Sequence, residues 1–253
     1  MNVITASYYL MLRALRESLR QPAMELTNVF IPMFFFAITV GAMGGIAAGA
    51  FGIDNFVGFQ MPVAIIQAVA GTSGSAWLGM VQDIERGYFD KLMLTPAPRV
   101  ALVLGRLAAD GVRSIFLTAL IIIAGLATGS GMESGVAGIA VLLLLGGMFG
   151  LAYAGIGMAI ALRTGSAQAA QAGFLIFFPL LFLSPAFAPK EVFAGWLEFL
   201  ATINPVTYIL QGMRDLVLEG WDWRSFLGML AAIFGIGAFT LTLTLTALRS
   251  RAA

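Results

Sequence analysis

Six long runs of apolar residues, separated by short polar stretches, dominate the pattern along this chain. A helix needs roughly 20 consecutive apolar residues to cross a bilayer, and each run is about that long or longer. The pattern therefore predicts an all-α membrane protein with six transmembrane helices in a single domain, 1–253. The six predicted spans cover 26–48, 57–81, 107–128, 136–162, 167–187 and 225–248.

The first 21 residues are too polar to span a membrane, but their apolar side chains recur at helical spacing. This pattern predicts an amphipathic helix in the membrane interface, with Arg13, Arg16 and Arg20 toward anionic headgroups. The alternative is a merely solvated N-terminal helix. The apolar face holds Ile4, Tyr8, Met11, Leu12, Leu15 and Leu19.

The polar loop 82–99, between the second and third spans, concentrates charge in the stretch DIERGYFDKLMLTPAPR. Ile84, Tyr88, Phe89 and Leu92 can form one face of a short helix, and Thr95 to Pro98 end it, because proline cannot continue the helical hydrogen bonds. Such a helix suits docking onto a water-soluble partner. Its predicted wet face holds Asp83, Arg86, Asp90 and Lys91.

The segment 188–224 is long, yet too apolar for a free aqueous domain. It predicts two short helices that dip into one leaflet as a re-entrant segment, where any non-helical turn must be shielded by protein or face water. Asn204 followed by Pro205 indicates an N-cap and the first helical residue. Trp196, Trp221 and Trp223 are expected at the interface.

Composition supports the membrane class and removes several chemistries. The chain of 253 residues is 60% apolar and 11% charged, with a mean hydropathy of +0.93. A net charge of +1 argues against nucleic-acid binding, and the chain has neither Cys nor His. The commonest general base and the commonest metal ligands are therefore absent. We expect no catalytic residues, metal site or cleaved signal peptide.

The distribution of Lys and Arg predicts that both termini are cytoplasmic. With that orientation, ten cations fall on the inner side, three fall on the outer side, and Arg113 lies in the third span. The inner cations are Arg13, Arg16, Arg20, Arg86, Lys91, Arg99, Arg106, Arg163, Arg249 and Arg251; the outer ones are Lys190, Arg214 and Arg224.

Charged and small residues also occur at the edges of the spans. Arg106, Asp110 and Arg113 share one helical face. We interpret them as an ion-paired cluster whose side chains reach interfacial water, with Glu25 as a further partner; the alternative is a functional site within the membrane. The motifs Gly41-x-x-x-Gly45 and Gly146-x-x-x-Gly150 indicate close helix packing.

Two stretches together make the chain resemble a known family. They are ERGYFDKLMLTPAPR, after the second span, and FLSPAFAPKEVFAGWLEFLATINPVTYILQGMRDL, between the fifth and sixth. With the amphipathic entry helix and six spans, they resemble the permease subunits of type-two ABC exporters. That family includes daunorubicin-resistance permeases, lipooligosaccharide exporters and transporters of O-antigen or teichoic acid. Members export drugs, lipids or glycans.

The resemblance implies a second permease, identical or paralogous, and two copies of a separate ATPase subunit that binds ATP and magnesium. The chain agrees in lacking a G-x-x-x-x-G-K-[ST] phosphate loop, so no cofactor is expected here. It implies a multi-pass protein of the inner (cytoplasmic) membrane, in contact with lipids. By resemblance, the coupling helix would comprise Glu85, Arg86, Gly87, Phe89, Asp90 and Lys91; the outer re-entrant segment would include Trp196, Asn204, Pro205, Tyr208 and Arg214.

Phenylalanines in the first and fifth spans could line a cargo path, although such side chains more often face lipid or a neighbouring helix. They are Phe34, Phe35, Phe174, Phe177 and Phe178. The main alternative function is an ion-coupled secondary transporter, which usually needs an ionisable group near the membrane midplane. The middles of the six predicted spans lack Asp, Glu, Lys and Arg. An intramembrane enzyme would need a catalytic set that the chain does not offer.

Overall fold

The computed structural model describes residues 2–252, apart from the side chains of Phe174 and Ala252. These residues form helices and no strand, so the predicted all-α class is confirmed. The long helices are α2 (Pro22–Phe51), α3 (Phe56–Glu85), α5 (Arg99–Ala127), α6 (Gly135–Thr164) and α11 (Trp223–Ala252). The short ones are α1 (Val3–Leu19), α4 (Tyr88–Met93), α7 (Ala167–Leu175), α8 (Phe177–Phe182), α9 (Gly195–Ile203) and α10 (Pro205–Leu218), with a 3-10 turn at Lys190–Val192.

Within the described residues, five helices are long and apolar enough to cross a membrane: α2, α3, α5, α6 and α11. The fifth predicted span, 167–187, is not one continuous helix, because the chain divides there into α7 and α8. Pro179 has no N–H to donate to the carbonyl of Leu175, where α7 ends. The hydroxyl of Tyr153 donates to the carbonyl of Gly173 at 2.8 Å, so a side chain serves one carbonyl close to the break.

The third predicted span also differs, because α5 begins at Arg99 rather than at Leu107. Pro98 is the N-cap of α5, and its backbone is extended. The helix therefore starts as soon as the proline-containing turn ends, and it carries Arg106, Asp110 and Arg113 well inside its length. The charged cluster thus belongs to the helix body rather than to a loop.

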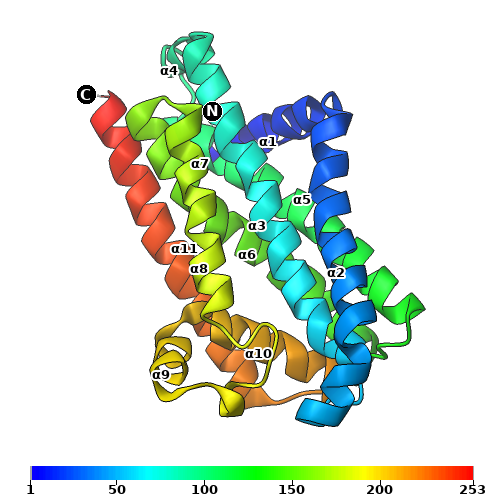
Figure 1. The fold of residues 1–253 in the computed structure, drawn as a ribbon. Coiled ribbons are helices and arrows are strands. Elements are labelled where there is room, and N and C mark those ends of the chain that lie inside the picture. The colour runs from blue at the N-terminus through cyan, green and yellow to red at the C-terminus, as the bar shows by residue number, and fades with distance from the viewer. Residues whose placement is uncertain (1, 253) are drawn as a thin grey trace.

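Figure 1 shows that the molecule has two distinct ends. Helices α1 and α4 and both chain termini lie at one end, which we call the termini end. Helices α9 and α10 lie at the other, the α9–α10 end. Helix α1 crosses the termini end at a steep angle to α2 and packs against α5 at Gly105, where a Cβ atom would stand 2.6 Å from Leu10 Cβ. The helix at the N-terminus is therefore present as predicted; its place in a membrane interface stays a prediction.

Helix α6 is the packing centre of the molecule, since it contacts α3, α5, α7 and α11. Its glycines allow these close approaches: Gly150 receives Ser114 of α5, and Gly157 receives the ring of Trp77 of α3. The motif Gly146-x-x-x-Gly150 therefore packs helices within this chain. Gly41 and Gly45, by contrast, face open space, because a Cβ atom added at either position would have no neighbour within 4 Å.

Candidate functional site

The short helix α4 projects at the termini end, and it is the helix predicted within the loop 82–99. Gly87 precedes it with φ of 65°, a left-handed conformation that glycine adopts at no steric cost. Phe89 is only 3% exposed and anchors α4 in the core. The charged residues predicted for coupling are exposed together at the surface: Glu85, Arg86, Asp90 and Lys91.

Two arginines from the ends of the chain hold the aromatic side chains of α4. The guanidinium of Arg13, from α1, lies 4.1 Å from the ring centre of Tyr88. That of Arg251, from the last turn of α11, lies 5.9 Å from the ring centre of Phe89. Both distances fall within the range of a cation–π contact. Helix α4 is therefore tied to the first and the last helix of the chain.

Beneath α4, Asp83 is the centre of an ionic network. Its carboxylate contacts Arg13 of α1 at 2.6 Å and Arg106 of α5 at 2.5 Å, and Arg106 also reaches Glu17 at 3.4 Å. The prediction that Asp83 faces water is wrong. Arg13 pairs with Asp83 while its side chain stays 35% exposed, and its contact with lipid headgroups stays a prediction. Helix α3 continues to Glu85, which places Asp83 inside its last turn and turns its carboxylate into the protein.

A second part of the network lies further along α5. Arg113 contacts Asp110 at 3.0 Å and Glu25 of α2 at 3.2 Å, and Ser73 of α3 donates to Asp110 at 2.9 Å. The predicted partnership of Glu25 with the cluster is confirmed. The expectation that the cluster reaches water is wrong for Asp110, which is completely buried. Buried charges in proteins are normally paired in this way, because unpaired ones cost too much free energy.

Sequence reasoning missed Asp83, Glu17 and Ser73 as partners of the cluster. One signal could have identified Asp83. The apolar run of the second span continues to Val81, so a helix extending one further turn brings the next acid back toward the bundle. The pairing with Glu17 depends on the packing of α1 against α5, and no local pattern indicates it.

At the α9–α10 end, the predicted cap is confirmed. The side chain of Asn204 accepts from the amide of Val206 at 3.0 Å, Pro205 is the first residue of α10, and the Asn204 amide donates to the carbonyl of Leu180 at 2.5 Å. Tyr208 donates to the carbonyl of Thr202 at 2.8 Å, and Trp196 is exposed. Whether this segment is re-entrant stays a prediction.

Arg214 of α10 is buried, although it was assigned to an outer segment. Its guanidinium donates to the carbonyls of Phe59, Pro185 and Ala186 at 3.0, 2.5 and 3.0 Å. It also stacks on the ring of Phe59, 3.5 Å from the ring centre. Burial lowers the pKa of Arg214 to about 9. Arg214 thus fixes the chain that follows α8 against the start of α3.

A cavity of about 510 Å³ lies between α2, α3 and the α7–α8 segment. Of the five phenylalanines predicted for a cargo path, it brings together Phe35 and Phe178. Phe34 is half exposed on α2, Phe177 lines a different cavity, and the side chain of Phe174 lies outside the described part of the chain. The lining also includes polar side chains that the sequence reasoning missed: Thr27, Asn28, Thr39, Gln60, Gln67 and Gln171. A mixed lining of this size suits a small amphipathic molecule.

Comparison with known proteins adds a family to this geometry. Residues 5–218 match the family described as ABC-2 type transporter. The chain is 24% identical over 217 residues to the daunorubicin resistance ABC transporter permease protein DrrB1 of Streptomyces coeruleorubidus, covering 85% of this chain and 76% of that one. It is 22% identical over 210 residues to the probable doxorubicin resistance ABC transporter permease protein DrrC of Mycobacterium tuberculosis (strain ATCC 25618 / H37Rv), covering 82% and 75%. It is 23% identical over 208 residues to the putative transport permease ycf38 of Porphyra purpurea, covering 81% and 71%.

Proposed function

The chain belongs to the ABC-2 type transporter family, and from this premise we propose that it forms half of an export path for drugs, lipids or glycans, driven by a separate ATPase. The membrane subunit of an ABC transporter is the function that the family supports directly. The resistance permeases among its relatives favour drugs as the cargo. An ion-coupled secondary transporter, the alternative from the sequence, is disfavoured by this family.

The observation that carries the coupling proposal is the construction of α4. The helix exposes Asp90 and Lys91 beside a buried Phe89, and Glu85 and Arg86 are exposed just before it. It is attached to α1 and α11 through Arg13 and Arg251. A mixed-charge surface gives a docking partner both specificity and register. Directly behind it, Asp83 joins α3, α1 and α5. A displacement of α4 would therefore be transmitted to α3, α1 and α5 through charged contacts rather than through a flexible loop.

We place the cargo path at the 510 Å³ cavity, because α2, α3 and the α7–α8 segment line it together. These are the first, second and fifth of the predicted spans, the ones expected to rearrange when the ATPase subunits close. The polar side chains, such as Gln60 and Gln171, would bind the polar groups of a cargo, and Phe35 and Phe178 its apolar part. Phe34 would then face a second permease or lipid.

The complete transporter would contain two permeases, identical or paralogous, and two ATPase subunits. ATP and magnesium would bind to the ATPase subunits and not to this chain, which would carry no catalytic residue of its own. The protein would lie in the inner membrane with both termini and α4 in the cytoplasm, and with the segment 188–224 in the outer leaflet.

The test of coupling uses the proposed ATPase subunit, co-expressed with the permease and purified through a tag on the permease. Reversing two charges in the turn that leads into α4, with Glu85→Lys and Arg86→Glu together, should reduce the amount of co-purified ATPase by about tenfold, because two favourable contacts become unfavourable. Glu191→Lys, an exposed change at the α9–α10 end, is the matched control and should leave it unchanged.

Gel filtration of the double variant checks that the permease itself remains folded. If the ATPase co-purifies equally with the double variant and with the Glu191→Lys control, the segment formed by α4 and the turn before it does not couple to the ATPase. If the purified permease moves its cargo at full rate without any ATPase, the proposed function is wrong altogether.

A further inference from the structure

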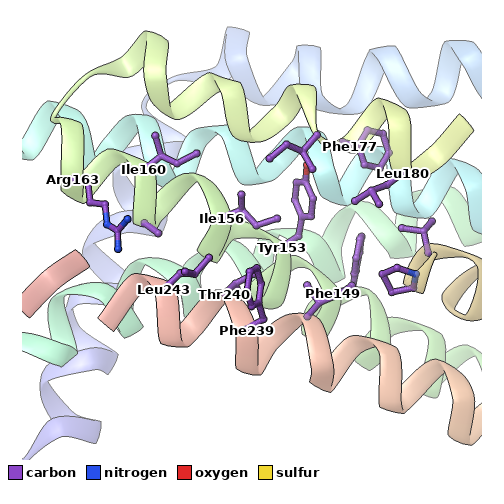
Figure 2. A pocket seen from close by; sticks show the side chains of 15 residues that line it. Phe149, Tyr153, Ile156, Ile160, Arg163, Phe177, Leu180, Phe239, Thr240 and Leu243 are labelled. Atoms are coloured by element: carbon purple, nitrogen blue, oxygen red, sulfur yellow. The ribbon is translucent and has the colours of Figure 1, made fainter. Parts of the chain in front are cut away.

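A second cavity, of about 450 Å³, lies on the other side of α8, between α6, α8 and α11. Figure 2 shows its lining side chains spread along α6 and α11, with Arg163 at one extreme and Phe149 toward the other. The size falls within the range of ligand sites in proteins. It is separate from the proposed cargo path, because different residues of α8 line the two spaces: Phe177 and Leu180 line this cavity.

The body of this cavity offers almost nothing for a polar ligand. Its two uncharged polar side chains already have partners within the protein: Thr240 donates to the carbonyl of Ala152 at 2.7 Å, and Tyr153 donates to that of Gly173 at 2.8 Å. The remaining lining is aliphatic or aromatic, apart from Arg163. Phe239 is 63% exposed and Ile176 is 45% exposed, so the cavity opens at the side of the helix bundle. In a membrane, that side meets acyl chains.

The end of the cavity at Arg163 is positively charged. Arg163 lies in the last turn of α6 and makes none of the ion pairs found among the described residues. Arg251 lies beside it, because its guanidinium donates to the carbonyl of Leu162 at 2.9 Å. Within the described part of the chain, no acid lines the cavity. The guanidinium of Arg163 at the end of an apolar space, with that of Arg251 nearby, is complementary to an anionic headgroup.

The length of the cavity agrees with a lipid tail. Along α6, Arg163 and Phe149 are about 21 Å apart at 1.5 Å of rise per residue. One leaflet of a bilayer has a hydrocarbon thickness of about 15 Å, half of the roughly 30 Å core. The cavity is therefore long enough for a tail that starts at Arg163 and extends about 15 Å along α6, to the level of Tyr153.

From these observations we propose that the cavity binds one acyl chain of an anionic phospholipid, with the lipid phosphate at Arg163. The lipid comes from the leaflet at the termini end. This site is additional to the export function and does not depend on it.

The test is native mass spectrometry of the purified permease, equilibrated with micelles that contain either phosphatidylglycerol or phosphatidylcholine. The protein should retain phosphatidylglycerol in preference to phosphatidylcholine. Arg163→Gln should lower the retained phosphatidylglycerol about fivefold, the effect of one cation near an anionic headgroup, and should leave phosphatidylcholine unchanged. Arg249→Gln removes an exposed cation from the last turn of α11, which also holds Arg251, and Arg249 does not line the cavity. This variant should change the retention of neither lipid.

A second variant tests the cavity itself. Leu243→Trp fills the space beside Arg163, and it should lower the retention of both lipids. If both Arg163→Gln and Leu243→Trp retain as much lipid as the unchanged protein, the proposal is wrong. If Leu243→Trp abolishes export yet retains lipid normally, the cavity belongs to the cargo path and the proposal is equally wrong. Failure of ATPase coupling alone would leave these lipid measurements unaffected.

Discussion

Among single residues, Asp83 connects the most parts of the molecule. It belongs to α3, pairs with Arg13 of α1 and Arg106 of α5, and lies directly before the turn into α4. The side chains of Asp83 and Arg106 are each only 8% exposed. Removing one partner of a buried pair leaves the other charge without compensation, which costs more than the pair contributes.

Asp83→Asn should therefore lower the free energy of unfolding by about 3 kcal/mol, because buried Arg106 then retains only its longer contact with Glu17, at 3.4 Å. The measurement is the thermal unfolding of the purified permease in detergent. Asp90→Asn, an exposed change on α4, is the control and should leave the unfolding temperature within experimental error. Adding Arg106→Gln to Asp83→Asn should restore part of the loss. A double variant as unstable as the sum of its single changes would contradict the pairing.

At the scale of helices, the sequence predicted most elements for the correct physical reason. The Asn204–Pro205 start of α10 and the proline end of the loop 82–99 rest on local rules that act within a few residues. The break between α7 and α8 was missed, because the run 167–187 is mostly apolar and a hydropathy count is insensitive to a proline such as Pro179. Tyr153, whose hydroxyl donates to the carbonyl of Gly173 near this break, lies in another helix, α6.

The glycines of α6 give a prediction for helix packing. A methyl group on Gly150 would collide with the side chain of Ser114 in α5, so Gly150→Val should separate the two helices and lower the unfolding temperature by several degrees. Gly235→Ala in α11 is the control, since that position has open space around it and alanine favours a helix. The same thermal unfolding experiment compares them. Equal unfolding temperatures for both variants would show that α5 and α6 do not approach closely at Gly150.

At the scale of the whole molecule, the predicted distribution of positive charge agrees with the arrangement of the helices. The arginines predicted to be cytoplasmic include Arg13, Arg106 and Arg251, and their contacts place them together around α3, α4 and the end of α6. The sequence located this collection of charge but not the pairing within it, since pairing depends on how α1 crosses the bundle. The candidate cargo path was likewise predicted only in part, through Phe35 and Phe178.

The orientation can be tested cleanly because the chain contains no cysteine. Single cysteines replacing Asp90 and Arg249 should react with a membrane-impermeant maleimide only after cells are permeabilised, since positive loops stay in the cytoplasm. Cysteines replacing Glu191 and Asp222 should react in intact cells. All four positions are exposed, so burial does not limit the reaction. The reverse labelling pattern would overturn the predicted orientation.

Helix α8 separates the two cavities and contributes side chains to the lining of both. Phe177 and Leu180 face one cavity, while Phe178, Leu181 and Phe182 face the other. A six-residue helix cannot turn toward one side without leaving room on the opposite side. A displacement of α8 by an occupant of the first cavity would therefore change the affinity of the second, and by linkage the second would change that of the first by the same factor. The lipid composition of the membrane would in this way influence the affinity of the transporter for its cargo.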